Sequence, residues 1–343
     1  MKAEGDPLPT DLSATVALLL APGKGLLAAD ESLGTIARRF EQVGIRSTEQ
    51  TRRNYRELLF TAPGIGEQIS GVILFDETIR QRAADGTPFP QLLEQRGAVP
   101  GIKVDLGARP LAFAPGESVT EGLDGLRDRM AEYRSLGARF TKWRAVLTIA
   151  QGRPSEYAMA VNAHALARFA ALSQEAGLVP VVEPEVLMDG DHTMEASAAA
   201  TIAALHATFD ELAAQRVDLE HLLLKPNMVL AGRDSPTQPS IEESATATLA
   251  CLRQTVPPAV PGVVFLSGGQ SPELATARLN AMNAAGPQPW VLTFSYSRAI
   301  QDPVLAEWRG EASNAPAAQD AFAVRARLNS LAQMGRYQAE ANR

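Results

Sequence analysis

Short apolar runs alternate with longer amphipathic stretches through almost the whole chain. The amphipathic stretches carry apolar residues at three- and four-residue steps, as a helix with one buried face requires. The clearest predicted helices are Leu123–Leu136, Glu156–Ala176, Thr193–Gln215, Ile241–Gln254 and Pro272–Ala284. The apolar runs predict eight strands. These strands are Gly25–Asp30, Val72–Phe75, Gly101–Asp105, Arg139–Val146, Val179–Leu187, His221–Val229, Val263–Ser267 and Trp290–Tyr296.

The alternation of strands and helices indicates parallel βαβ units, and eight of them favour one closed (β/α)₈ TIM barrel over an open sheet. No long Gly/Ser/Pro linker divides the chain. We therefore expect a single domain over residues 1–343, with a helical lead-in at about 1–24 and a C-terminal helical segment at about 315–343.

Composition narrows the class of protein. The net charge of −7 argues against nucleic acid as a partner, because such binding needs a basic surface. Cys251 is the only cysteine, which excludes an internal disulfide and favours a reducing compartment. No stretch approaches the length of a membrane span, and the apolar run Val16–Ala21 follows an acidic rather than a basic start. We expect a cytoplasmic protein without a membrane partner.

Charged or hydroxyl-bearing residues lie at nearly every predicted strand end, where the loops of a barrel build its active site. Side chains two apart on a strand share a face, so Lys142 and Arg144 can point inward together, as can Glu183 and Glu185. Charged residues at one or two strand ends would be ordinary solvated residues, whereas charged residues at nearly every strand end favour a shared site. The end residues are Asp30, Asp76, Glu77, Lys103, Asp105, Lys142, Arg144, Glu183, Glu185, Lys225, Ser267 and Arg298.

Lys225 lies in a strongly apolar segment, where an unpaired ammonium would be costly to bury. Desolvation and neighbouring cations lower the pKa of a lysine and produce the free amine that attacks a carbonyl. A lysine in an apolar strand is more often paired or snorkelling, but the nearby Lys142 and Glu183 favour the reactive interpretation. A carboxyl such as Glu183 can donate and then accept a proton during carbinolamine formation and dehydration.

The segment Phe265–Gln270 contains Ser-Gly-Gly between the seventh predicted strand and a helix. Glycines and a helix start form a phosphate cradle, and this is a common phosphate site in barrels, with Arg298 as the counter-charge. Paired carboxylates are also compatible with a metal or with salt bridges alone. The four histidines have no ligand spacing, and no nucleotide-binding motif is present. We therefore expect neither a metal nor another cofactor.

Seven motifs, in the same order, resemble class I fructose-bisphosphate aldolases. They are Gly25–Ser32 (GLLAADES), Gly101–Asp105 (GIKVD), Lys142–Arg144 (KWR), Val182–Glu185 (VEPE), Leu224–Met228 (LKPNM), Phe265–Gln270 (FLSGGQ) and Ser295–Gln301 (SYSRAIQ). The resemblance covers roughly residues 10–337. It implies a (β/α)₈ barrel, a homotetramer, a phosphorylated sugar substrate and no metal.

The resemblance also implies a role for each matching residue. Lys225 matches the Schiff-base lysine, and Glu183 matches the acid/base for forming and dehydrating the carbinolamine. Asp30 matches the carboxylate that assists carbon–carbon cleavage at the C4 hydroxyl, and Lys142 matches the lysine that orients substrate. Arg144 and Glu185 match supporting residues, and Lys103 and Arg39 match substrate-binding residues, with Arg39 at the other side of the mouth. Ser32 and Thr35 lie where the family has hydroxyls near the second phosphate. The positions at the first phosphate site are Ser267, Gly268, Gly269, Ser295 and Arg298.

The implied activity is that of a metal-independent lyase of glycolysis and gluconeogenesis. It would reversibly cleave fructose 1,6-bisphosphate to dihydroxyacetone phosphate and glyceraldehyde 3-phosphate. The motifs indicate the Schiff-base and phosphate chemistry more specifically than they indicate the length of the sugar. Sedoheptulose 1,7-bisphosphate and fructose 1-phosphate therefore stay open as preferred substrates. A non-catalytic scaffold with the same fold is a further alternative, which the presence of all the essential groups disfavours.

Three features depart from the family pattern. Ser297 stands where the family usually has glycine, and we expect it to tighten or reshape the phosphate loop. Leu106 replaces a residue that is often lysine, a small loss of positive potential. Tyr337 matches the segment before the C-terminal tail of animal members, whose final tyrosine assists proton transfer to the enamine. Because this chain ends at Arg343, we expect slower reprotonation or another proton donor.

Overall fold

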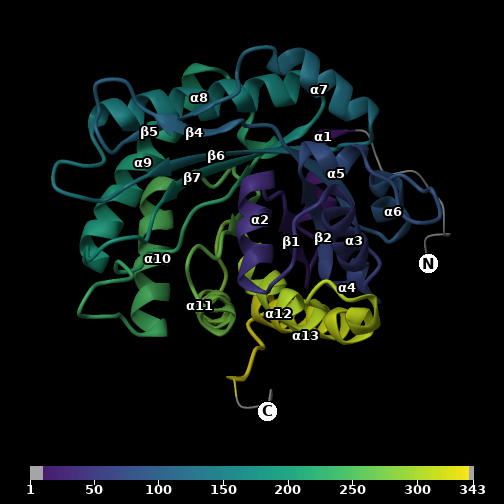
Figure 1. The fold of residues 1–343 in the computed structure, drawn as a ribbon. Coiled ribbons are helices and arrows are strands. Elements are labelled where there is room, and N and C mark those ends of the chain that lie inside the picture. Colours follow the sequence, from purple (N-terminus) through teal and green to yellow (C-terminus); the bar gives the residue numbers. More distant parts are fainter. Residues whose placement is uncertain (1–10, 340–343) are drawn as a thin grey trace.

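Eight parallel strands close into a barrel in the computed structural model, which describes residues 11–339 (Figure 1). β1 pairs with β2 on one side and with β10 on the other, which completes the ring. The predicted (β/α)₈ barrel is therefore confirmed. The barrel strands are β1 (Gly25–Ala29), β2 (Ile69–Leu74), β3 (Val99–Lys103), β6 (Phe140–Leu147), β7 (Val179–Val186), β8 (Leu223–Leu224), β9 (Gly262–Phe265) and β10 (Val291–Tyr296).

Helices cover the outside of the barrel, and the five predicted from periodicity correspond to α7–α11 (Figure 1). Four of these begin after a serine or threonine whose side chain accepts the amide hydrogen three residues on, which satisfies a donor that the helix leaves unpaired. The helices are α1 (Leu12–Leu19), α2 (Leu33–Gln42), α3 (Glu49–Phe60), α4 (Ile65–Gln68), α5 (Asp76–Arg80), α6 (Phe89–Gln95), α7 (Leu126–Ser135), α8 (Glu156–Glu175), α9 (Met194–Ala214), α10 (Ile241–Thr255), α11 (Pro272–Ala284), α12 (Arg298–Trp308) and α13 (Ala315–Gln333), with short 3₁₀ turns at Leu219–His221 and Ala312–Asn314.

One predicted strand is shorter in the structure, and one hairpin was not predicted. The predicted strand His221–Val229 is paired only over β8, because His221 lies in a 3₁₀ turn and Pro226 has no amide hydrogen with which to continue the ladder. The Lys225 amide still donates to the carbonyl of Val182 at 2.8 Å, so the lysine keeps its place at the strand end. The hairpin of β4 (Gly107–Pro110) and β5 (Ser118–Glu121), which sequence analysis did not anticipate, forms a separate antiparallel pair.

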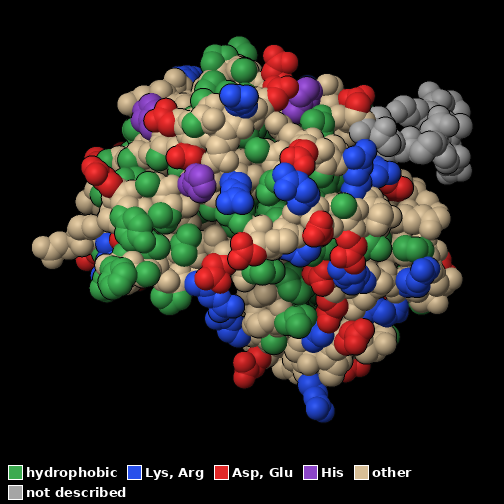
Figure 2. Space-filling model, turned by 90° about the horizontal axis from the view of Figure 1, so that it is seen from above, with side chains coloured by type: hydrophobic (Ala, Val, Ile, Leu, Met, Phe, Trp, Pro, Cys, Tyr) green, Lys and Arg blue, Asp and Glu red, His purple; other side chains and the backbone are tan. Residues whose placement is uncertain are grey.

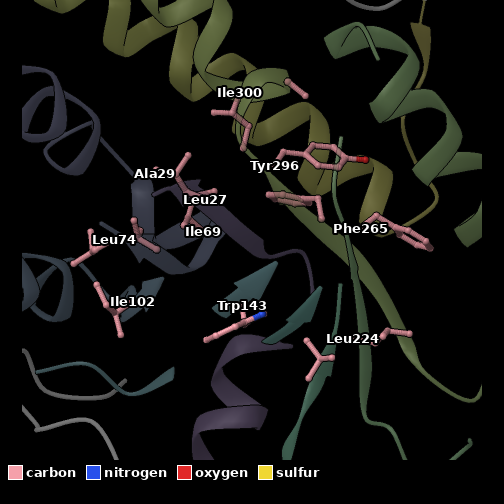
Figure 3. Close-up of a cluster of buried hydrophobic side chains, with 14 of the residues drawn as sticks. Leu27, Ala29, Ile69, Leu74, Ile102, Trp143, Leu224, Phe265, Tyr296 and Ile300 are labelled. Atoms are coloured by element: carbon pink, nitrogen blue, oxygen red, sulfur yellow. The ribbon is translucent and has the colours of Figure 1, made fainter. Parts of the chain in front are cut away.

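Alternate side chains of the strands enter two different cores. Figure 3 shows one of them, in which Leu27, Trp143 and Phe265 come from barrel strands and Ile300 from α12. The other core lies on the opposite faces of the strands, where α1 contributes Val16 and Leu19 to a cluster that includes Phe140. This two-residue alternation places apolar side chains both under the helices and inside the barrel.

The ends of the chain follow the expectation where they are described. α1 falls within the predicted lead-in, and α13 falls within the predicted C-terminal segment. Residues 1–10 and 340–343, which belong to those two predictions, lie outside the described residues. The assignment of the whole chain to a single domain stays a prediction.

Candidate active site

The inner faces of four strands change from apolar to charged as they reach one end of the barrel. On each strand, an apolar side chain of the core inside the barrel is followed two positions later by a buried charged side chain. The pairs are Ala28 and Asp30, Phe140 and Lys142, Val181 and Glu183, and Leu223 and Lys225. The two-residue period therefore brings four ionisable groups together at the same end.

These four groups form one buried cluster around Glu183. The Nζ of Lys142 lies 2.7 Å from Glu183 Oε2 and 3.0 Å from Asp30 Oδ2. The Nζ of Lys225 lies 3.4 Å from Glu183 Oε1. Glu183 thus contacts both lysine nitrogens with its two oxygens, as a group that moves protons between neighbouring atoms requires.

The two lysines have opposite pKa shifts. Burial lowers the pKa of Lys225, an effect that Lys142 reinforces and Glu183 only partly offsets. Burial also disfavours the charge on Lys142, but Asp30 and Glu183 outweigh it and raise the pKa of Lys142 well above its usual range. Burial alone would raise the pKa of Asp30, yet the lysines around it lower that pKa to about 2. The geometry therefore makes Lys142 a fixed cation, Asp30 a fixed anion and Lys225 the lysine able to lose its proton.

Two further ion pairs surround this cluster. Arg144 donates from Nε to Glu185 Oε2, and Lys103 Nζ lies 2.9 Å from Asp105 Oδ1. Asp105 also accepts the amide hydrogens of Arg144 at 3.2 Å and of Gly107 at 3.1 Å. It thereby connects the barrel to the β4–β5 hairpin. Asp105 was predicted as a strand-end residue but not as a site residue, and of these contacts only the one to Gly107 depends on the unanticipated hairpin.

A cleft of about 1000 Å³ opens over these groups at the mouth of the barrel. All the predicted site residues except Gly269 line it. They are Asp30, Ser32, Thr35, Arg39, Lys103, Lys142, Arg144, Glu183, Glu185, Lys225, Ser267, Gly268, Ser295 and Arg298. The cleft also contains charged and polar residues that sequence analysis did not assign to the site. They are Glu31, Arg38, Gln42, Asp105, Arg109, Ser297 and Asp302.

One wall of the cleft is formed by the loops that follow β9 and β10. Arg298 donates to the carbonyl oxygen of Gly268, whose φ of +58° lies in the left-handed region that favours glycine. Ser295 Oγ is buried and has no hydrogen-bond partner among the described residues, so its hydroxyl is available to a ligand. Gly269 does not line the cleft. Its amide donates to Met188 Sδ at 3.1 Å, so that amide is already engaged by a thioether.

An adjoining wall is formed by the segment after β1 and by α2, since β1 pairs with β10. Ser32 precedes the helix, and its Oγ accepts the amide hydrogen of Thr35 at 3.4 Å. Arg39 donates from Nη1 to Glu31 Oε1 and from Nη2 to Asp302 Oδ1, the latter at 2.7 Å. Sequence analysis named Arg39 without these partners. The only available signal for Glu31 was its position beside Asp30.

The described residues contain no group of three or more His, Cys, Asp or Glu side chains arranged to hold a metal ion. None of the described helices combines the length and apolar character needed to span a bilayer. On the face shown in Figure 2, acidic and basic side chains are interspersed, and the described residues there form no broad basic surface.

The low pKa of Asp30 leads to a test on stability. Because folding lowers this pKa, ionised Asp30 stabilises the fold fully above the usual carboxylate range, and the effect is lost as the pH falls through about 2. Asp30→Asn should lower the free energy of unfolding by about 2 kcal/mol near pH 6, and by progressively less below pH 4. Urea unfolding across this range measures the difference, with exposed Asp320→Asn as the control. A difference that does not vary with pH would contradict the assignment.

A closed barrel with a buried lysine beside a carboxylate defines a barrel enzyme equipped to attack a carbonyl through a free amine. The family model described as fructose-bisphosphate aldolase class-I matches residues 11–343. The chain belongs to the class-I fructose-bisphosphate aldolase family.

Individual relatives are similar over nearly the whole chain. A protein of Xanthomonas campestris pv. campestris named "Probable fructose-bisphosphate aldolase class 1" is 53% identical over 327 residues, which are 95% of this chain and 98% of that protein. The Arabidopsis thaliana protein "Fructose-bisphosphate aldolase 4, cytosolic" is 51% identical over 332 residues, 96% of this chain and 84% of that one. A solved structure of Plasmodium falciparum fructose-bisphosphate aldolase, in complex with TRAP and an inhibitor, superposes with a TM-score of 0.95 at 46% identity, covering 97% of this chain and 98% of that one.

Proposed function

We propose that this chain reversibly cleaves fructose 1,6-bisphosphate to dihydroxyacetone phosphate and glyceraldehyde 3-phosphate through a Schiff base on Lys225. The observation that carries the proposal is the pairing of a buried lysine of lowered pKa with Glu183, beside the fixed cation Lys142. The family of the chain and the names of its relatives support the same reaction.

The bond-making steps follow from these contacts. The free amine of Lys225 attacks the C2 carbonyl of the sugar, and Glu183 supplies the proton with which the C2 oxygen leaves as water. The resulting iminium withdraws electrons from C3. Asp30, held ionised by its lysine neighbours, accepts the C4 hydroxyl proton as the C3–C4 bond breaks into an enamine and an aldehyde. Lys142 offsets the negative charge that the substrate oxygens develop.

Two cationic walls suit a substrate with two phosphates. Arg298, with Ser267, Gly268 and Ser295, lies on one wall and would bind the phosphate next to the reacting ketone. Ser32, Thr35 and Arg39 lie on the adjoining wall and would bind the second phosphate, and Lys103 also lines the cleft. Binding both ends positions the reacting carbons over Lys225 and Asp30.

The test is a cleavage assay in the presence of EDTA, comparing fructose 1,6-bisphosphate, sedoheptulose 1,7-bisphosphate and fructose 1-phosphate by kcat/KM. The highest kcat/KM is expected for fructose 1,6-bisphosphate, without inhibition by EDTA. A preference for either of the other sugars would change the assigned substrate and leave the lysine chemistry in place. Absence of cleavage for all three would favour a non-catalytic scaffold.

We also propose a single-domain, cytoplasmic homotetramer that works in glycolysis and gluconeogenesis. The lone, buried Cys251 is compatible with a reducing compartment, and one relative is named as cytosolic. Light scattering in solution tests the proposed number of subunits.

A further inference from the structure

A second charged cluster lies behind the wall of the cleft formed by α2, centred on the carboxylate of Glu31. This side chain is 6% exposed and accepts hydrogen bonds from Arg39, Arg56, Ser297 and Gln301. Its donors come from α2, α3 and the start of α12, so the cluster connects three helices. Glu31 is therefore a fixed, fully satisfied anion rather than a group free to meet a ligand.

Ser297 holds one end of the Arg39 guanidinium in this cluster. Its Oγ donates to Glu31 Oε1 at 2.6 Å and accepts from Arg39 Nη1 at 3.1 Å. Serine before a helix usually caps the helix amides, but Ser297 makes no such bond. Its hydroxyl instead joins the loop after β10 to Arg39. Glycine at this position would remove both contacts.

The other end of the guanidinium has a different kind of partner. Arg39 Nη2 donates at 2.7 Å to Asp302, whose side chain is 50% exposed and lines the cleft. Arg39 Nε is buried and has no hydrogen-bond partner in the described part of the chain. Nε and Nη2 together form the edge with which arginine binds a phosphate through two parallel hydrogen bonds. Asp302 occupies only half of that edge.

We propose that Asp302 is a displaceable internal anion on the phosphate-binding edge of Arg39, and that it sets the affinity of the cleft for the second phosphate of the substrate. A phosphate would replace one hydrogen bond by two, while buried Glu31 and Ser297 keep the guanidinium in place. The half-exposed Asp302 can turn into solvent, whereas Glu31 cannot. This inference rests on the proposed function for the identity of the substrate.

The test compares Asp302→Asn with Asp320→Asn, which makes the same charge change on an exposed residue of α13 that does not line the cleft. Asp302→Asn should lower the KM for fructose 1,6-bisphosphate about threefold to tenfold and tighten the binding of inorganic phosphate, measured by calorimetry, to a similar degree. The KM for fructose 1-phosphate, which lacks the second phosphate, should change less than about twofold. Asp320→Asn should change none of these values.

Ser297 provides the opposite test. Ser297→Gly should raise the KM for the bisphosphate about threefold to tenfold, because Arg39 Nη1 keeps Glu31 but loses the second of its two partners. Ser297→Thr should restore the original KM by returning the hydroxyl. The proposal is overturned if Asp302→Asn behaves like Asp320→Asn, or if it shifts the KM of both sugars equally. Phosphate calorimetry does not depend on turnover. Tighter phosphate binding in a protein that cleaves no sugar would therefore reject the proposed function and retain the role of Asp302.

Discussion

Lys225→Met is expected to lower kcat by about four orders of magnitude or more, because Lys225 alone has a lowered pKa among the described lysines that line the cleft. Methionine has a similar length and suits the buried surroundings, and Glu183 keeps Lys142 as a partner. The fold should therefore survive. Steady-state kinetics measure the loss, and borohydride reduction with dihydroxyacetone phosphate, followed by peptide mass mapping, locates the adduct.

Lys103→Met is the matched control, since Lys103 also lines the cleft but is paired with Asp105. This variant should still form the reduced adduct on Lys225. An adduct on another lysine in Lys225→Met, or turnover close to that of the unaltered protein, would contradict the assignment of the Schiff-base residue.

Glu183→Gln should lower kcat about 10²-fold to 10⁴-fold, because an amide of the same shape cannot exchange the proton that the C2 oxygen needs in order to leave. Glu183 also raises the pKa of Lys225, so its loss should lower that pKa further and leave the amine free to attack. The attack would then proceed while dehydration stalls. Borohydride should therefore trap less adduct on Lys225 than in the unaltered protein during the time of one turnover, because it reduces the iminium and not the carbinolamine.

Glu185→Gln serves as the comparison, since Glu185 pairs with Arg144 and does not contact either buried lysine. Its effect on kcat should be smaller than that of Glu183→Gln by about tenfold or more. Equal losses in the two variants would assign the proton transfer to the whole set of carboxylates rather than to Glu183.

The barrel and the buried charged cluster around Glu183 could be predicted because both depend on the two-residue period of a strand. Once Lys142 and Glu183 are placed on strands, the period alone turns them inward at the same end. The length of β8 could have been predicted as well, since Pro226 follows Lys225 directly and cannot extend the hydrogen-bonded ladder.

The cluster around Glu31 could not be predicted in this way. Arg39 was named only through the family resemblance and Arg56 was not named at all, because the two lie on different helices and nothing in the sequence pairs them. Only the packing of α2, α3 and α12 brings them to one carboxylate. Gly269 illustrates a related limit, because a Ser-Gly-Gly turn predicts amides near a phosphate without indicating which amide faces the cleft.

The buried charged cluster has a consequence for the energy of the covalent intermediate. Asp30 and Lys142 are held with opposite charges, so they cancel within the cluster. When Glu183 gives its proton to the leaving C2 oxygen it becomes an anion, and the iminium on Lys225 becomes a cation beside it. The positive charge of the intermediate therefore forms next to a new negative charge, and the sum over the four groups stays at zero. Net charge is unfavourable at a site so shielded from water, so this pairing lowers the energy of the covalent intermediate.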